Sequence, residues 1–366
     1  VTLSSSTAAS PTFTAPSSAT TLQFVVVVSD GTTSHADTVT INVSTVNVAP
    51  TISNLSGDSL SYTEGAGAVV IEQGANALVA DSDSANFDTG TLTVSIPSGN
   101  EPTEDVLSIR NQGTGAGQIG VSGGNVTYGG VTIGTFSGGA GGNNLVITFN
   151  ANATPTTVTA LARNITYEDI NTDSPTSGAF TIRFTLTDGD GGTTANYDVS
   201  ANVTAVNDAP TDLALSANTV AENAANGTVV GSVTGTDVDT GDTKTYSLTD
   251  TAGGRFAINS STGELTVANG SLLNYEAATI HTVTVRVTDS GGLTYDEPFT
   301  INLTNVNEAP TGADATVTLT EDTAHTFTTA NFGFGDVDAG DSLSAVRIDS
   351  LPTPGSLTLF GVAIVA

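Results

Sequence analysis

Cysteine, methionine and tryptophan are all absent from this 366-residue sequence. Without cysteine the chain can form neither disulfide bonds nor thiolate metal sites, so zinc and iron–sulfur chemistry is largely excluded and hard oxygen ligands remain. Aromatic residues make up only 5% of the chain, which disfavours a carbohydrate-binding module built on an aromatic platform. Such a module stays as an alternative.

Basic residues are also scarce: Lys and Arg number 7 against 37 Asp and Glu, a formal net charge of −30. A surface this negative repels phosphate backbones and anionic lipid, so we expect no nucleic-acid partner. The longest apolar run, residues 24–28, is far shorter than the ~20 residues of a membrane helix, and we expect no membrane insertion in this segment. No signal peptide opens the sequence, which we interpret as the sign of an internal part of a longer protein.

Groupings typical of catalysis are missing as well. The histidines, His35, His281 and His325, stand alone, and no spacing suggests a Ser-His-Asp triad. Paired carboxylates could form a glycosidase site, but acids that recur at domain ends fit metal ligands better. The sequence therefore predicts that the chain is not an enzyme, with a hydrolase of unknown type as the alternative.

What the sequence does contain is a repeat. Segments with the pattern Val-Asn-x-Ala-Pro-Thr occupy residues 46–51, 206–211 and 306–311. Three acidic features keep nearly the same intervals: Asp-x-Asp pairs beginning at residues 81, 237 and 336, a Glu at 64, 222 and 321, and an Asp that ends a strand-like run at 30, 188 and 289. The shared spacing indicates one module, with roughly sixty extra residues in its second copy.

Alternating apolar and polar residues predict β-strands throughout. In residues 282–288, valines alternate with polar residues, which is the period of two of a half-buried strand, and residues 180–186 and 22–28 repeat the pattern. Each run meets an Asp-Gly or Gly-rich turn. No segment shows a sustained period of 3.6, and the Gly-rich residues 113–142 read as turns between short strands. We predict an all-β fold of tandem Greek-key β-sandwiches in an elongated array.

The domain map follows from the linkers. We expect residues 1–49 to be the C-terminal part of a sandwich, 50–209 an expanded domain, 210–309 a compact one and 310–366 the N-terminal part of another. As an alternative, half-domains complement each other between chains by strand exchange.

Residues 212–310 resemble a cadherin repeat. The matching segments are Val-Ala-Glu-Asn at 220–223, Asp-Val-Asp at 237–239, Arg-Phe-Ala-Ile at 255–258, Gly-Glu-Leu at 263–265, Leu-Asn-Tyr-Glu at 273–276, Val-Arg-Val-Thr-Asp at 285–289 and Asn-Val-Asn-Glu-Ala-Pro at 305–310. Residues 50–209 resemble the family more loosely, and residues 1–49 look like an immunoglobulin-type bacterial repeat. The linkers resemble those of large, secreted bacterial surface proteins.

The resemblance implies cadherin-like domains with calcium at their junctions. Calcium takes about six to eight oxygen ligands, and clustered carboxylates repel one another without a cation. Carried over to this sequence, the junction between the second and third domains would use Glu64, Glu168, Asn207, Asp208, Asp237, Asp239 and Asp289. The junction between the third and fourth would use Glu222, Glu276, Asn305, Asn307, Glu308, Asp336 and Asp338. The first junction offers Asn47, Asp81, Asp83 and Asp188.

Strand order adds a spatial expectation: Asp237, Asp239 and Asp289 should converge at one end of their sandwich, with Glu222 and Glu276 at the other. Some positions depart from the family pattern. Val48 replaces the linker acid of the first junction, which should weaken that site, and Asn274 and Asn305 supply amides where the family often has acids.

The resemblance thus implies a calcium-stiffened stalk of structural or adhesive function, secreted or at the cell surface, within a larger bacterial protein. Its expected partners are calcium, the neighbouring domains of the same chain, and a homophilic, cell-surface or matrix partner. The alternative within this class is a self-assembling subunit of an extracellular filament or matrix.

Overall fold

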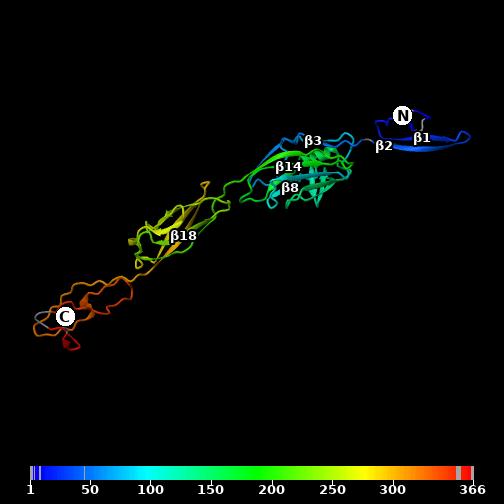
Figure 1. The fold of residues 1–366 in the computed structure, drawn as a ribbon. Coiled ribbons are helices and arrows are strands. Elements are labelled where there is room, and N and C mark those ends of the chain that lie inside the picture. Colours follow the sequence, from blue (N-terminus) through cyan, green and yellow to red (C-terminus); the bar gives the residue numbers. More distant parts are fainter. Residues whose placement is uncertain (1–2, 4, 8–9, 45, 352–355, 364–366) are drawn as a thin grey trace. The chain divides into compact units, whose positions relative to one another are not determined.

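The computed structural model describes residues 3, 5–7, 10–44, 46–351 and 356–363 (Figure 1). The chain divides into two compact units, residues 1–206 and 207–366. No helix in the described part of the chain is long and apolar enough to cross a membrane.

The first unit opens with a hairpin of β1 (Thr20–Ser29) and β2 (Ser34–Val43), paired in antiparallel register. In β1, Leu22 and Phe24 are half-buried and the residues next to them are exposed, which is the alternation expected of a strand. Val26 and Val28 on the same strand are exposed, and the described part of residues 1–49 contributes nothing to a buried core cluster.

The main body of this unit, which we call the first sandwich (residues 51–204), is built from three sheets. An eight-stranded sheet has the order β4-β15-β14-β7-β12-β11-β10-β9, a three-stranded sheet the order β5-β13-β8, and β3 pairs with β6. The strands are β3 (Thr51–Ser53), β4 (Ser59–Thr63), β5 (Val69–Val70), β6 (Leu78–Ala80), β7 (Thr91–Ser98), β8 (Asp105–Ile109), β9 (Ile119–Ser122), β10 (Asn125–Tyr128), β11 (Val131–Ser137), β12 (Leu145–Phe149), β13 (Ile165–Asp169), β14 (Gly178–Leu186) and β15 (Tyr197–Thr204).

The expansion predicted for this segment consists largely of β9–β12 and one helix. The predicted turns of the Gly-rich stretch join the strands: Gly123 and Gly124 link β9 to β10, and Gly129 and Gly130 link β10 to β11, all with positive φ, as two-residue hairpin turns require. Because β12 also pairs with β7, these hairpins extend the sheet sideways rather than forming a separate domain.

The helix α1 (Pro155–Ala162) was not expected, because its apolar residues show no clear period. Thr154 caps its N-terminus: Thr154 and Thr157 exchange side-chain to backbone hydrogen bonds, and Pro155 occupies the first turn. This Thr-Pro start is a known helix signal, since proline has no N–H to satisfy there. Buried Val158 and Leu161 hold the helix against the core.

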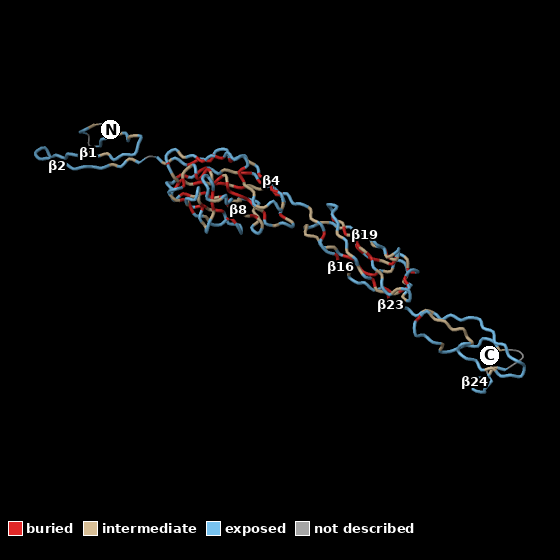
Figure 2. Tube along the Cα trace, turned by 180° about the vertical axis from the view of Figure 1, so that it is seen from behind, coloured by how far each residue is buried: buried red, intermediate tan, exposed pale blue. Residues whose placement is uncertain are grey.

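The cores of the two sandwiches are formed by alternate residues of their strands, which point to the inner face of each sheet. In β14, Ile182, Phe184 and Leu186 are fully buried, whereas the residues between them are only half-buried. They join one continuous cluster that includes an edge-to-face contact of Tyr62 with Tyr167. Figure 2 shows buried residues along both sandwiches and few elsewhere.

The second unit contains the second sandwich (residues 212–304), with two four-stranded sheets ordered β16-β18-β21-β20 and β17-β23-β22-β19. Val283, Val285 and Val287 of β22 are fully buried, as their alternation predicted. Its elements are β16 (Asp212–Leu215), β17 (Thr219–Ala221), β18 (Val229–Thr236), β19 (Thr245–Asp250), β20 (Phe256–Ile258), β21 (Glu264–Val267), the 3-10 turn η1 (Gly270–Leu272), β22 (Ile280–Thr288) and β23 (Thr294–Thr304). The expected β-sandwich fold class is confirmed.

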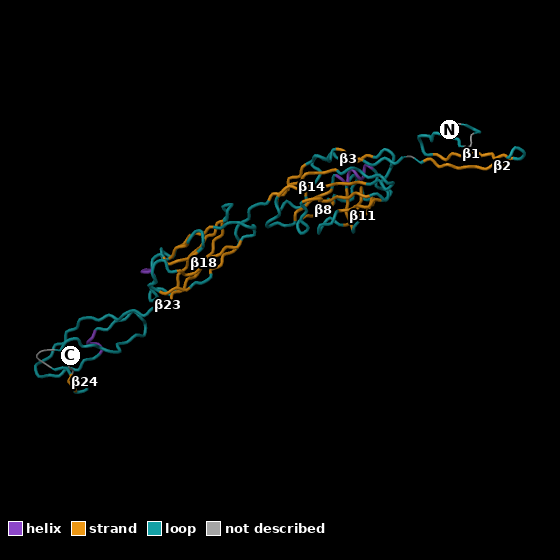
Figure 3. Tube along the Cα trace, in the orientation of Figure 1, coloured by secondary structure: helices purple, strands orange, loops and turns teal. Residues whose placement is uncertain are grey.

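Residues 310–366 contain little regular structure in their described part (Figure 3). They include the 3-10 turn η2 (Thr329–Phe332), the short hairpin β24 (Thr358–Leu359) with β25 (Val362–Ala363), and a bridge between Thr311 and Gly335. Whether this segment opens a further sandwich stays a prediction, as do the four domain boundaries.

Candidate metal sites around the linkers

Glu222 lies at one end of the second sandwich, directly after β17. This strand runs parallel to β23, so the linker that follows β23 starts beside it. The side chain is 1% exposed and accepts two backbone hydrogen bonds: Oε1 from the Val306 N–H at 2.9 Å and Oε2 from the Tyr275 N–H at 2.8 Å. Glu222 therefore fastens the linker and the loop after η1 to the end of the sandwich.

Two further glutamates join it to form what we call the Glu cluster (Glu222, Glu276 and Glu308). One carboxylate oxygen of each lies within 4.8 Å of the others. Asn223 donates its amide N–H to Glu308 Oε1 at 2.8 Å, whereas Glu308 Oε2 is buried without a hydrogen-bond partner. A buried carboxylate oxygen without a donor is an available ligand atom.

The charges around Glu308 are all of one sign. Desolvation, followed by the negative charges of Glu222, Asp338 and Glu276, raises the pKa of Glu308. The ion pairs of the described residues lie elsewhere and join Arg183 to Asp198, Arg286 to Asp296 and Arg347 to Asp349. A bound cation would relieve this repulsion.

Asp338 meets the same linker from the other side. Its Oδ1 accepts from the Asn305 amide at 2.8 Å, its Oδ2 accepts from the Glu308 N–H at 2.9 Å, and the residue is 7% exposed. With Asp336 and Asp341 it forms the second Asp cluster, again with oxygens within 4.8 Å. Asn307, which was also predicted here, donates its amide N–H to the Glu308 carbonyl rather than to an acid of either cluster.

The opposite end of the second sandwich carries the first Asp cluster (Asp237, Asp242 and Asp289). Asp237 follows β18 and Asp289 follows β22, and one oxygen of each acid lies within 4.8 Å of the others. Asp289 is 6% exposed, and its Oδ2 accepts from the Asn207 amide at 2.9 Å. Asp237 Oδ2 is buried without a hydrogen-bond partner.

Asp239 lies next to this cluster rather than in it. Its own N–H donates to Asp237 Oδ1 at 3.0 Å, and its Oδ2 accepts from the Asp208 N–H at 2.8 Å. Asp237 and Asp289 thus converge at this end, as strand order predicted, whereas Asp239 lies beside them and Asp242 takes its place in the cluster. Glu222 and Glu276 lie near the other linker.

The same linker contact occurs three times in the chain. The second acid of each Asp-x-Asp pair accepts the N–H of the third residue of the Val-Asn-x-Ala-Pro linker: Asp83 from Val48 at 3.0 Å, Asp239 from Asp208 at 2.8 Å, and Asp338 from Glu308 at 2.9 Å. Because the donor is a backbone group, this contact survives at Val48, where the linker acid is missing. The repeat found in the sequence is therefore a repeat of geometry.

The first linker has the contacts without the acidic cluster. The Asn47 amide donates to Asp188 Oδ2 at 2.9 Å. Burial alone would raise the pKa of Asp188, but hydrogen bonds from Asn47, Gly192 and Asp190 outweigh it and lower the pKa. Asp81 Oδ2 is buried without a partner, yet in the described part of the chain no group of three close acids forms around Asp81, Asp83 and Asp188.

Glu64 and Glu168 belong to the first unit. Glu64 Oε2 accepts from the Val206 N–H at 2.6 Å, which repeats the contact of Glu222 with Val306, and its Oε1 is buried without a partner. Glu168 is half-buried on β13. Neither belongs to a group of three close acids among the described residues.

Two cluster members, Asp242 and Asp341, were missed by the sequence analysis. Asp242 accepts from both the backbone N–H and the hydroxyl of Ser290, and the hydroxyl hydrogen bond is the main cause that lowers the pKa of Asp242. A signal was present: the pattern Asp-Val-Asp-x-Gly-Asp occupies residues 237–242 and 336–341, at the interval of the other repeated features.

The family whose sequence pattern matches the chain is the cadherin domain, over residues 217–304, about a quarter of the chain. None of the curated proteins compared with the chain matches it. Solved structures similar to it include extracellular cadherin domains 1–4 of protocadherin gamma B7, at 16% identity and a TM-score of 0.39, with 83% of this chain and 63% of that chain covered. Domains EC22–24 of mouse cadherin-23 match at 17% identity and a TM-score of 0.38, with 74% and 71% covered. The chain thus spans less than two thirds of the four-domain protocadherin chain in that structure.

Proposed function

We propose that this chain is a calcium-binding structural and adhesive segment of an extracellular protein, in which tandem cadherin-like domains are joined at linkers that hold calcium. The observation that carries the proposal is the Glu cluster, where three carboxylates converge on a linker and one buried oxygen has no donor. Oxygen-only ligands of this kind suit a hard cation such as calcium.

The calcium would act through the linkers. Glu222 and Glu276 belong to the second sandwich, whereas Glu308 lies in the linker itself. A cation bound by all three would fix the linker to the sandwich, because the ligands can meet only in one arrangement. Calcium stiffening of a stalk follows from this coupling, as does the dependence of stability on the ion.

We further propose that the site set comprises the residues assigned to the second and third junctions, extended by Asp242 and Asp341. The first junction should bind more weakly, since Val48 supplies no carboxylate. The Val-Asn-acid-Ala-Pro linkers resemble those of bacterial surface proteins, which supports a secreted or cell-surface location in a bacterium. Binding and mechanical roles, rather than catalysis, fit carboxylates that repeat at linkers.

The test is a calcium titration of the full chain after chelation, with thermal unfolding and small-angle scattering as readouts. We expect calcium to raise the melting temperature and to increase the particle's maximum dimension and stiffness. Asp242→Asn should weaken binding roughly tenfold through the loss of one charged ligand, whereas Glu264→Gln, an exposed acid on β21, should leave it unchanged. Stability and scattering that ignore calcium would refute the proposal.

A further inference from the structure

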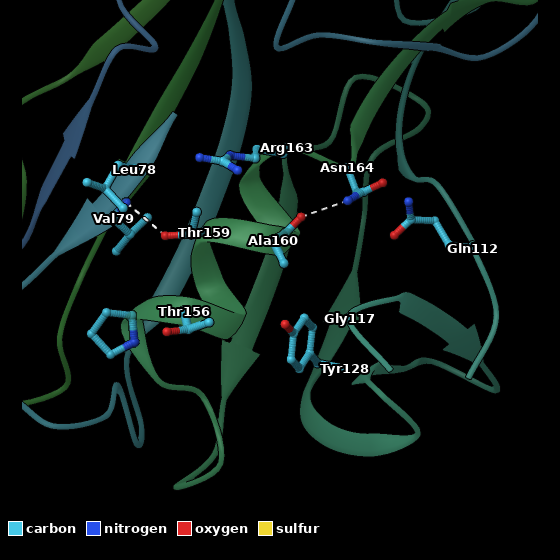
Figure 4. Close-up of a pocket in the computed structure, with 11 residues that line it drawn as sticks. Leu78, Val79, Gln112, Gly117, Tyr128, Thr156, Thr159, Ala160, Arg163 and Asn164 are labelled. Atoms are coloured by element: carbon cyan, nitrogen blue, oxygen red, sulfur yellow. Dashed lines mark hydrogen bonds between the residues drawn. The ribbon is translucent and has the colours of Figure 1, made fainter. Parts of the chain in front are cut away.

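A pocket lies in the first sandwich, away from the linker acids. It has a volume of about 480 Å³ and lies between α1, β6, β10 and the loop from β8 to β9. This volume is within the range of about 300–1,000 Å³ that is usual for small-molecule sites. Figure 4 shows the Tyr128 ring across the space from Ala160 of α1, with Arg163 and Gln112 on different sides.

The residues that line this pocket carry a positive charge, whereas the chain as a whole is strongly negative. Although the sequence has 37 acidic residues, no lining residue is acidic, and Arg163 is the only charged residue among them. Arg163 takes part in none of the ion pairs of the described residues. Its Nε donates to the Ala77 carbonyl at 2.7 Å, which holds the side chain in place and leaves the two Nη groups for a ligand.

The other lining groups suit a ligand that is rich in hydroxyls. Gln112 Oε1 accepts from the Ile119 N–H at 3.0 Å, so its amide orientation is set and its N–H groups are available. The Tyr128 and Thr156 hydroxyls make no hydrogen bond within the described part of the chain, and both residues line the pocket. The Tyr128 ring supplies an aromatic wall with a polar tip.

We propose that this pocket binds a sugar that bears a carboxylate, a hexuronate unit of an acidic polysaccharide. The planar guanidinium of Arg163 matches a carboxylate with two parallel hydrogen bonds. Tyr128 packs on the apolar face of the sugar ring, and Gln112 and Thr156 bind its hydroxyls. The net negative charge of the chain repels an acidic polysaccharide, and Arg163 supplies the local positive charge that attracts one uronate unit of it.

The experiment measures binding of a galacturonate trisaccharide to the full chain by isothermal titration calorimetry, both in calcium and in excess chelator. The chelator matters because calcium on the linker acids could bridge to uronate. We expect binding in both conditions, and affinity for neutral maltotriose at least roughly tenfold lower, since it lacks the charged partner of Arg163.

Two variants test the location. Arg163→Gln should weaken uronate binding at least roughly tenfold. Ala160→Leu should block the pocket without removing a hydrogen bond, and so keeps the test valid even if Arg163→Gln unfolds. Arg286→Gln, which removes an equal charge from an exposed ion pair of the second sandwich, should bind like the parent. Absence of uronate binding, binding only with calcium, equal binding of maltotriose, or unchanged binding by Ala160→Leu would overturn the proposal.

Discussion

Glu222 offers the sharpest test of how the linker and the metal site depend on each other. Glutamine has nearly the same shape but only one acceptor oxygen, so Glu222→Gln leaves either the Val306 or the Tyr275 N–H facing an NH₂ group. A hydrogen bond to a charged acceptor contributes about 1.5–3 kcal/mol, and relief of the repulsion with Glu276 and Glu308 offsets part of its loss, so we expect the second sandwich to lose about 2 kcal/mol even without calcium.

Glu222→Gln should lose further stability only when calcium is present. At a calcium concentration of about 1,000 Kd, the parent gains about 4 kcal/mol from binding. If the lost charge weakens calcium binding about tenfold, calcium stabilises the variant by about 1.4 kcal/mol less than the parent. The total difference should therefore grow from about 2 kcal/mol in chelator to more than 3 kcal/mol in calcium.

Hydrogen exchange is the suitable assay, because a chain with two compact units has no single unfolding free energy. Protected amides of β22 and β23 report opening of the second sandwich alone. Glu264→Gln serves as the control, since it removes one exposed charge and should change protection little. Protection of Glu222→Gln equal to that of this control in chelator, or protection of the parent that calcium leaves unchanged, would refute the role of Glu222 in holding the linker and the ion.

Two further predictions concern the second sandwich without its ion. Desolvation, and after it the charge of Arg255, lowers the pKa of His281 in the folded chain, so the unfolded chain binds a proton at a higher pH than the folded one. In urea unfolding with chelator, we therefore expect the free energy of unfolding to be largest above about pH 6.5 and to fall as the pH drops below it. His281→Gln should remove this pH dependence. Gly263 has a φ of +69°, and an added Cβ would lie 2.3 Å from the Val233 carbonyl oxygen, so Gly263→Ala should cost about 1–3 kcal/mol in the same assay.

Both predictions, for His281→Gln and for Gly263→Ala, can be contradicted by the same unfolding measurements. An unaltered slope in His281→Gln would assign the pH dependence to the carboxylates instead. For the glycine, Gly292→Ala is the matched control: φ is +94° there, but no atom lies within 4 Å of the added Cβ, so only the backbone cost of about 1 kcal/mol applies. Equal losses in the two variants would show that the close approach to Val233 does not matter.

The strands were predictable because their signal is local. The alternation of Val283, Val285 and Val287 reports the two faces of a strand directly, and the structure buries these residues. The helix α1 was missed because its eight residues are largely threonine and alanine, with a weak apolar face. Only its Thr154-Pro155 start carried a local signal.

For the candidate sites, spacing identified most of the acids but not their partners. Glu222 and Glu308 belong to features that recur along the chain, and the structure brings them together. That Asp242 rather than Asp239 completes the first Asp cluster depends on the path of the loop after β18 and on the contact with Ser290. Which acids bind calcium stays a prediction.

The sequence by itself determined the all-β character, the repeat, and the absence of thiolate ligands, since each follows from composition or from patterns in the chain. Only the tertiary structure decided which distant side chains meet. Glu222 reaches Val306 because β17 pairs in parallel with β23, and Arg163 shares a pocket with Tyr128 because β9–β12 extend the sheet beside α1. Such meetings depend on the register of strands far apart in the chain, and no local pattern encodes that register.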